Sequence, residues 1–259
     1  MWVNNINPTI LDLGPVEIRW YGLVYVFGAL LVYWMLEYAR KKGTLELSQK
    51  EVSDFVVWLL VGVLIGSRLF LILFYDLSYY LSQPWKMIAF WEGGMSFHGG
   101  LVGIVVACYL FCRKKNLIFL RMADILSAPL MLALALGRIA NFINGELWGT
   151  VSNAKWCVAF PHASDGGTLC RHPYQLYDGV KRFVLFGWLL FLGRKTFTAG
   201  FIFWNFVLFE GLGRFLLDFF KDEFTYWIFT PGQWMSLVMV VVAVYFFWKN
   251  HKEDWKNVF

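Results

Sequence analysis

The sequence has few charged residues and few cysteines for a chain of 259 residues. Charged side chains make up only 16% of it, whereas a soluble domain carries about 25%. Intrinsic disorder is excluded, because it requires low hydrophobicity together with many charges. Four cysteines are too few for a disulfide scaffold. These shortages leave a folded, strongly apolar protein.

The residues present in excess are apolar and aromatic, at 59% and 20% of the chain. Trp and Tyr gather at the bilayer–water interface of membrane proteins. Basic residues outnumber acidic ones by five, and they lie in short clusters between apolar runs. That placement is typical of a membrane-orientation signal and argues against a nucleic-acid partner. The composition predicts an all-α polytopic membrane protein, with residues 1–259 as one transmembrane domain.

Seven segments approach the roughly 20 apolar residues that a transmembrane helix needs. We expect spans at 20–36, 55–75, 93–112, 125–145, 173–193, 199–220 and 228–248. The fifth is the weakest, because Asp178, Lys181 and Arg182 crowd its first half. The first lacks the basic region and the small-residue cleavage site of a signal peptide, so we expect it to be retained.

The positive-inside rule sets the expected orientation. Thirteen Lys and Arg residues fall on one set of loops and seven on the other. An odd number of spans puts the termini on opposite sides, so the N-terminus is expected outside and the C-terminus in the cytoplasm. An outer loop region at about 149–172 contains Cys157 and Cys170, either bridged or free. Cys108 and Cys112 are expected to be packing residues, because no His accompanies them as a metal ligand.

Three arginines, Arg68, Arg138 and Arg214, fall within the expected spans. A charge at the bilayer centre costs on the order of 2.5–3.5 kcal/mol on insertion scales, so each needs a carboxylate, a water-filled cavity or an anionic ligand. All three lie in the outer halves of their spans, which predicts one shared pocket open to the outer leaflet. Glu210 and Asp218 share the helix face of Arg214. They form either a self-contained ion-pair ladder or a support that turns Arg214 toward a ligand.

Further polar residues lie at the outer ends of the spans. Asn141, Asn144 and Glu146 follow Arg138 in the fourth span, and four glycines flank His98 in the third. These residues either make interhelical hydrogen bonds or contact a ligand. Arginine binds phosphate through bidentate hydrogen bonds. The pattern therefore predicts a site for a phospholipid or another anionic amphiphile.

Two more motifs begin spans at the outer interface. RWYGLVY, at 19–25, places Tyr21 at the start of the first span, and RHPYQLYD, at 171–178, places His172 at the start of the fifth. Tyr21 also fits an aromatic belt, and His172 also fits an ordinary helix start.

The run GRIANFINGELWG, at 137–149, closely resembles the signature of the prolipoprotein diacylglyceryl transferases. GGMSFHGGL at 93–101, GLGRFLLDFF at 211–220 and the two motifs above are similar to further motifs of that family, in the same order. The resemblance covers nearly the whole chain. It implies transfer of the diacylglyceryl group of phosphatidylglycerol to the lipobox cysteine of a preprolipoprotein, with a thioether and glycerol 1-phosphate as products.

The resemblance and the polar pattern together assign roles to individual residues. His98 is expected to act as base or proton relay, while Arg138 and Arg214 bind the phosphate and stabilise the leaving group. The expected substrate-binding residues are Tyr21, Arg68, Asn141, Asn144, Glu146, Gly149 and His172. No metal and no cofactor is expected. The protein is expected to be a monomeric, multi-pass protein of the cytoplasmic (inner) membrane.

The chain departs from the family pattern at several positions. Glu210 stands where the family has Tyr, and Asp178 and Asp218 stand where it has Glu. The remaining differences are Ala140, Thr150, Tyr174 and Lys221. Two other functions stay open: an anion transporter, which would usually show an internal repeat, and a lipid-binding protein on this fold without catalysis.

Overall fold

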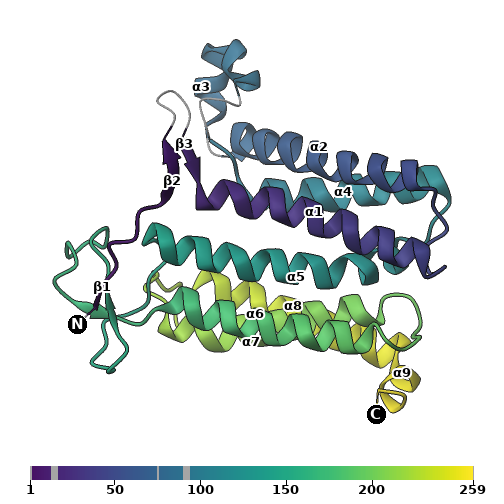
Figure 1. Ribbon diagram of the computed structural model, residues 1–259. Helices are drawn as coiled ribbons and strands as arrows, with labels where there is room; N and C mark the ends of the chain where they lie inside the picture. The colour runs from purple at the N-terminus through teal and green to yellow at the C-terminus, as the bar shows by residue number, and fades with distance from the viewer. Residues whose placement is uncertain (1, 13–16, 75, 90–93, 259) are drawn as a thin grey trace. The chain divides into compact units, whose positions relative to one another are not determined.

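The computed structural model describes residues 2–12, 17–74, 76–89 and 94–258, and helices dominate it (Figure 1). The chain forms two compact units. Unit 1 combines Met1–Leu31 with Ala123–Phe259, and unit 2 is Val32–Met122. The boundaries between them fall inside two long helices, α1 (Trp20–Lys41) and α5 (Phe119–Asn144).

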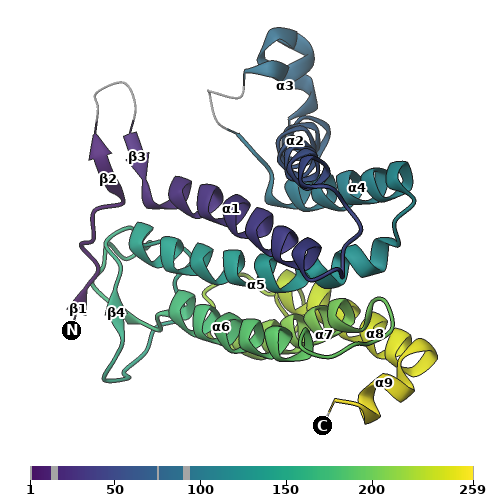
Figure 2. The same cartoon turned by 45° about the vertical axis from the view of Figure 1, so that its right-hand side comes forward.

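Unit 1 is a helical bundle in which α6 (Tyr174–Leu192) packs on α7 (Phe201–Leu217), and α7 packs on α8 (Pro231–Asn250). Figures 1 and 2 show α5 running alongside these helices. A short helix, α9 (Lys252–Lys256), follows α8. The aromatic rings of Phe201, Phe247 and Trp255 lie in contact where α7, α8 and α9 meet. This apolar core fixes one end of the bundle.

Side chains close the helix ends of unit 1. Asp124 of α5 accepts hydrogen bonds of 2.8 Å from the backbone N–H groups of Gly200 and Phe203, at the start of α7. A carboxylate there satisfies free donors and complements the helix dipole. Thr230 and Gln233 form a capping box at the start of α8. These caps fix where α7 and α8 begin.

Unit 1 also contains short strands, and the sequence does not predict them. The strand β1 (Trp2–Val3) pairs in parallel with β4 (Val158–Ala159), and β4 pairs antiparallel with β5 (Cys170–Arg171). A separate hairpin joins β2 (Thr9–Asp12) to β3 (Glu17–Arg19). Three of these strands, β1, β4 and β5, are only two residues long, too short for a strand periodicity to be read in the sequence.

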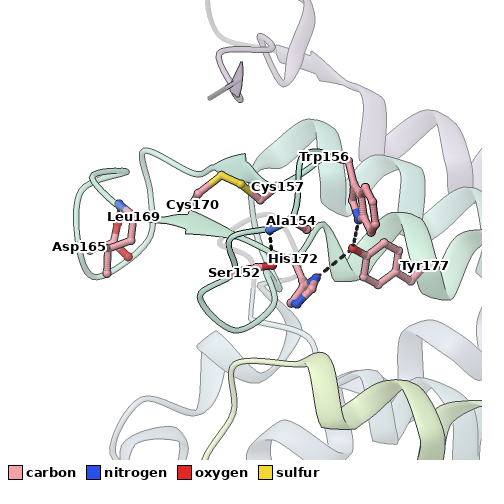
Figure 3. Close-up of a disulfide and its surroundings, with 9 residues drawn as sticks. All are labelled: Ser152, Ala154, Trp156, Cys157, Asp165, Leu169, Cys170, His172 and Tyr177. Carbon is pink, nitrogen blue, oxygen red and sulfur yellow. Dashed lines mark hydrogen bonds between the residues drawn. A yellow bond between two sulfur atoms is a disulfide. The ribbon is translucent and has the colours of Figure 1, made fainter.

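A disulfide joins Cys157 and Cys170, which decides between the two alternatives left by the sequence. Figure 3 shows it beside the paired strands of the outer loop region. The bridge ties this loop, which has little regular structure, into one piece. By contrast, Cys108 and Cys112 are free and buried in unit 2, as the packing interpretation predicts.

Unit 2 is built around α2 (Gln49–Phe74) and α4 (Phe97–Lys115), with a short helix α3 (Leu77–Ser82) and a 3-10 turn η1 (Pro84–Ile88). Glycines form the contact between α2 and α4: Gly62 and Gly66 face Gly99 and Gly103. A Cβ atom on Gly103 would overlap the backbone carbonyl of Gly62. Small residues at this spacing let two helix backbones approach closely, as in membrane helix pairs.

In the part of the chain that the structure describes, four helices, α1, α2, α5 and α8, are long and apolar enough to cross a membrane. The other three expected spans coincide with α4, α6 and α7, of 19, 19 and 17 residues. The expected spans 55–75 and 93–112 each include a residue outside the described ranges, at positions 75 and 93. A multi-pass helical membrane protein is therefore supported, and the count of seven crossings remains a prediction.

Candidate active site

Arg138 projects from α5 toward α6 and is held along one edge of its guanidinium group. Its Nε donates to Asp178 Oδ2 at 2.6 Å, and its Nη1 lies 3.3 Å from Asn141 Oδ1. The guanidinium carbon lies 5.8 Å from the ring centroid of Tyr174. Within the described ranges, its Nη2 makes no hydrogen bond. Arg138 is thus oriented by its neighbours and keeps a donor for a ligand.

The end of α5 brings the polar residues of the fourth-span motif together. Gly145 has a positive φ of 65°, which L-residues rarely adopt, and this turn carries Glu146 back toward the helix. Glu146 Oε1 then accepts from Asn141 Nδ2 at 2.7 Å and from Asn144 Nδ2 at 3.4 Å. The sequence motif therefore becomes one hydrogen-bonded group that begins at Arg138.

Four charged side chains form a cluster between α6 and α7: Asp178, Lys181, Arg182 and Glu210. Asp178 is fully buried, with Lys181 Nζ at 2.7 Å and Arg182 Nη2 at 3.4 Å. Glu210 lies 2.6 Å from Arg182 and 2.8 Å from Lys181. Glu210 thus pairs with α6, so a ladder confined to Glu210, Arg214 and Asp218 is wrong.

Arg214 has a looser arrangement than Arg138. Its Nε lies 3.6 Å from Asp218 Oδ2, and its side chain is 34% exposed. Asp218 itself is buried and accepts the hydroxyl hydrogen bond of Tyr174 at 2.5 Å. Because Tyr174 contacts both Arg138 and Asp218, the two predicted arginines of unit 1 belong to one connected site. A Cβ on Gly232 would crowd the Arg214 guanidinium, so this glycine leaves it room.

Gly149 and Thr150 hold the loop at about 149–172 against the short 3-10 turn η3 (Asp218–Phe220), which directly follows α7. The Gly149 N–H donates to the His172 carbonyl at 2.9 Å, and the Thr150 N–H donates to the Phe220 carbonyl at 2.9 Å. A Cβ on Gly149 would lie 2.7 Å from His172 Cβ. The structure therefore explains Gly149 by close backbone packing, and a direct contact between Gly149 and substrate remains a prediction.

A hydrogen-bond chain holds the His172 ring in place (Figure 3). Trp156 Nε1 donates to the Tyr177 hydroxyl at 2.7 Å, and that hydroxyl lies 3.0 Å from His172 Nδ1. Nδ1 is thus engaged within the protein.

Arg171 ties the same loop together through ion pairs. It contacts Asp165 at 2.5 Å and Asp222 at 2.6 Å, and its side chain is buried. The hydrogen bond from Arg171 holds the pKa of Asp165 below its ordinary value of 3.8. The loop that carries His172 is thus fixed by charge as well as by the disulfide.

Two predicted site residues, Arg68 and His98, lie in unit 2. Arg68 is buried, stacks on the Tyr80 ring at 5.2 Å and donates to backbone carbonyls at Lys86, Met87, Ala89 and Gly94. These contacts hold η1, Ala89 and Gly94 against α2. His98 lies in the first turn of α4, with its ring centroid 6.3 Å from that of Phe70. A pocket shared by Arg68, Arg138 and Arg214, and substrate contacts of Arg68, remain predictions.

Tyr21 lies in the first turn of α1, within unit 1. Its ring is 5.2 Å from that of Tyr25, edge to face. The structure gives it a half-buried position, which fits either the aromatic-belt or the ligand-binding interpretation.

Sequence reasoning missed several residues that build this site. In the sequence, Asp178, Lys181 and Arg182 indicate only a weak fifth span, and Tyr174 and Asp178 stand out only as departures from the family motif. The free-energy cost of burying charge could have identified them. Three charged side chains within one and a half turns of an expected membrane helix require partners inside the bundle. The partner of two of them, Glu210, lies 28 or more residues away in the sequence.

Comparisons with known proteins agree with the motifs. The family model described as prolipoprotein diacylglyceryl transferase matches residues 8–249. A phosphatidylglycerol–prolipoprotein diacylglyceryl transferase of Geobacter sulfurreducens is 46% identical over 84% of this chain and 83% of its own length. Proteins of the same name from Brucella anthropi and Bordetella parapertussis are 38% and 40% identical, covering 98% and 92% of this chain and 95% and 93% of their own lengths. The chain belongs to the prolipoprotein diacylglyceryl transferase family.

Proposed function

We propose that this protein transfers the diacylglyceryl group of phosphatidylglycerol to the lipobox cysteine of preprolipoproteins, the first step of lipoprotein maturation. The observation that carries the proposal is the connected site around Arg138 and Arg214, built from the signature motifs of the family. The named relatives act on the same two substrates.

The arrangement around Arg138 favours a phosphate ligand. Three cations, Arg138, Lys181 and Arg182, share two carboxylates, Asp178 and Glu210. Glu146 is held by neutral amide groups of Asn141 and Asn144. Counted with Glu146, the site around Arg138 holds three cations and three carboxylates. Arg138 keeps its Nη2 without a hydrogen bond among the described residues, and a phosphate oxygen is a suitable acceptor for that donor.

The reaction forms a bond from the cysteine sulfur to the terminal glyceryl carbon and breaks the bond from that carbon to the phosphate oxygen. The electron pair of the broken bond stays on glycerol 1-phosphate, where a positive charge stabilises it. Arg138, through its available Nη2, and the loosely paired Arg214 are placed to supply that charge. The attacking thiol is mostly protonated at neutral pH, and we assign His98 to accept and pass on its proton.

The remaining predicted residues have supporting roles in this proposal. Asn141, Asn144 and Glu146 orient Arg138 and contact the glycerol headgroup. His172 contacts a substrate oxygen. Tyr21 and Arg68 contact the lipid, and Gly149 keeps the outer loop close to the site. The reaction needs no metal or cofactor in this scheme.

The proposal includes the membrane arrangement. Residues 1–259 form one transmembrane domain with seven crossings in the cytoplasmic (inner) membrane, the N-terminus outside and the C-terminus inside, and the protein acts as a monomer. The arrangement places the disulfide in the oxidising compartment, where disulfides persist. Reporter fusions after residue 115 and at the C-terminus should both report the cytoplasmic side.

The direct test is to incubate the purified protein with phosphatidylglycerol vesicles and a synthetic lipobox peptide. We expect the peptide to gain the mass of one diacylglyceryl group on its cysteine, with an equal amount of glycerol 1-phosphate released. Lipid binding without any mass gain would favour the lipid-binding alternative. Passage of an anion across sealed vesicles without either product would favour the transporter.

A further inference from the structure

Glu210 is the most unusual residue of the α6–α7 cluster. The resemblance to the family predicts a tyrosine at this position. The four-residue spacing from Glu210 to Arg214 also predicts an ion pair between these two residues. Among the described residues, Glu210 forms no ion pair with Arg214, which instead lies near Asp218. Glu210 is buried in α7 and binds two cations of α6. A buried carboxylate is retained only with partners, so its presence must be explained together with Lys181 and Arg182.

The two cations are shared between two carboxylates. Arg182 lies 2.6 Å from Glu210 but 3.4 Å from Asp178, so Glu210 holds it more closely. Lys181 bridges the two, at 2.8 Å from Glu210 and 2.7 Å from Asp178. Arg182 also donates to the Leu134 carbonyl of α5 at 3.3 Å. Glu210 therefore binds Arg182 and part of the Lys181 charge, so that Asp178 does not have to neutralise both cations.

Asp178 is the residue that orients Arg138. Arg138 Nε binds Asp178 Oδ2 at 2.6 Å, and the same oxygen faces Arg182. Without the charge on Glu210, both Lys181 and Arg182 would turn to Asp178 as the remaining carboxylate of the cluster. Arg138 would then compete with two cations for one carboxylate.

The opposite helix is shaped to hold this arrangement. Gly213, one turn after Glu210 on α7, lies against the aliphatic stem of Lys181, and a Cβ there would overlap that stem. The space at Gly213 thus lets Lys181 cross α7 and reach Glu210.

We infer that Glu210 is a positioning residue for Arg138: it binds Arg182 and shares Lys181, and so reserves Asp178 for the arginine that clamps the lipid phosphate. The inference rests on the proposed function for the identity of the ligand. It predicts that neutralising Lys181 together with Glu210 leaves Arg182 as the one cation of α6 that competes with Arg138 for Asp178, and so restores most of the lipid binding that Glu210→Gln alone loses.

The test compares Glu210→Gln with the double variant Glu210→Gln/Lys181→Gln. Glu210→Gln should raise the KM for phosphatidylglycerol about tenfold, the scale of one misplaced charge-assisted hydrogen bond. The KM for the lipobox peptide should not change. The double variant restores the original charge balance and should return the lipid KM to within about threefold of the unchanged protein. Glu253→Gln, at an exposed ion pair with Lys256, is the matched control and should change neither constant.

Comparing the KM for phosphatidylglycerol with the KM for the peptide distinguishes a positioning role of Glu210 from a general loss of stability. A destabilised bundle would change the KM for both substrates. An unchanged lipid KM in Glu210→Gln, or no recovery in the double variant, would overturn the inference. If Glu210→Gln fails to fold, the folded, charge-balanced double variant must still show a near-normal lipid KM. Binding of fluorescent phosphatidylglycerol in detergent micelles is measured in parallel, so the inference stays testable even if the unchanged protein transfers nothing.

Discussion

The α6–α7 contact of unit 1 and the α2–α4 contact of unit 2 both join two packed helices, but they are made by opposite kinds of residue. The helices α2 and α4 meet through glycines, so close that a single Cβ would overlap backbone. The helices α6 and α7 meet through buried ion pairs. Glycine contacts give a helix pair stability at no electrostatic cost, whereas buried charges are expensive and add little stability of their own. Under the proposed function, the charges of unit 1 serve ligand binding.

The largest effect is expected for Arg138→Ala, which tests whether the charges of unit 1 take part in the reaction. We expect transfer to fall by at least about 10³-fold, because a preorganised donor to the leaving group is lost. Insertion and thermal unfolding should stay close to those of the unchanged protein, since Arg138 is one member of a larger network. The mass assay for the lipidated peptide measures the first effect, and detergent-solubilised unfolding measures the second. Normal activity in a folded variant would remove the phosphate-clamp assignment.

His98→Gln tests whether unit 2 contributes chemistry as well as packing. Turnover should fall by about 10²-fold if His98 accepts the thiol proton. The loss should shrink as pH rises, because more of the peptide thiol is then ionised without a base. Rates measured between about pH 6 and pH 9 with the same peptide check both points. A near-normal rate at neutral pH would reject His98 as the base.

Gly103→Ala tests the glycine contact directly. The added methyl group has no space against Gly62, and overpacking of this kind costs about 1–3 kcal/mol of unfolding free energy. Gly100→Ala is the matched control on the same helix, because its Cβ would lie 3.6 Å from Val63, an ordinary contact. The unfolding temperatures of the two variants should therefore differ clearly. Equal temperatures would show that α2 and α4 can move apart freely.

The smallest expected effect concerns the outer loop. Asp165 has a lowered pKa in the folded protein because Arg171 binds its charged form. Its contribution to stability is complete above the ordinary value of 3.8 and is lost as the pH falls through the lower folded value. The unfolding temperature of the unchanged protein should thus approach that of Asp165→Asn in acid and exceed it near neutral pH. A difference that is independent of pH would contradict the ion pair.

Much of the architecture could be predicted from local patterns. Apolar length located the helices, and the motif around Arg138, Asn141 and Glu146 identified the family and a group that does hydrogen-bond together. Other features depend on residues far apart in sequence. The backbone contacts of Arg68 and the pairing of Glu210 with α6 carry no local signature. The short strands β1 and β4 also form only because chain segments more than 150 residues apart meet.

By itself, the sequence determined the membrane class, the positions of the main helices and the family, because these depend on composition, apolar length and motif order. Only the tertiary structure decided which charge partners which. Asp178, Lys181 and Arg182 have fixed positions on one helix face, but their stability depends on Glu210 and Arg138 from two other helices. Hydrogen-bonded ion pairs need contact between the two groups, so the partners are decided only when the bundle has brought the helices together.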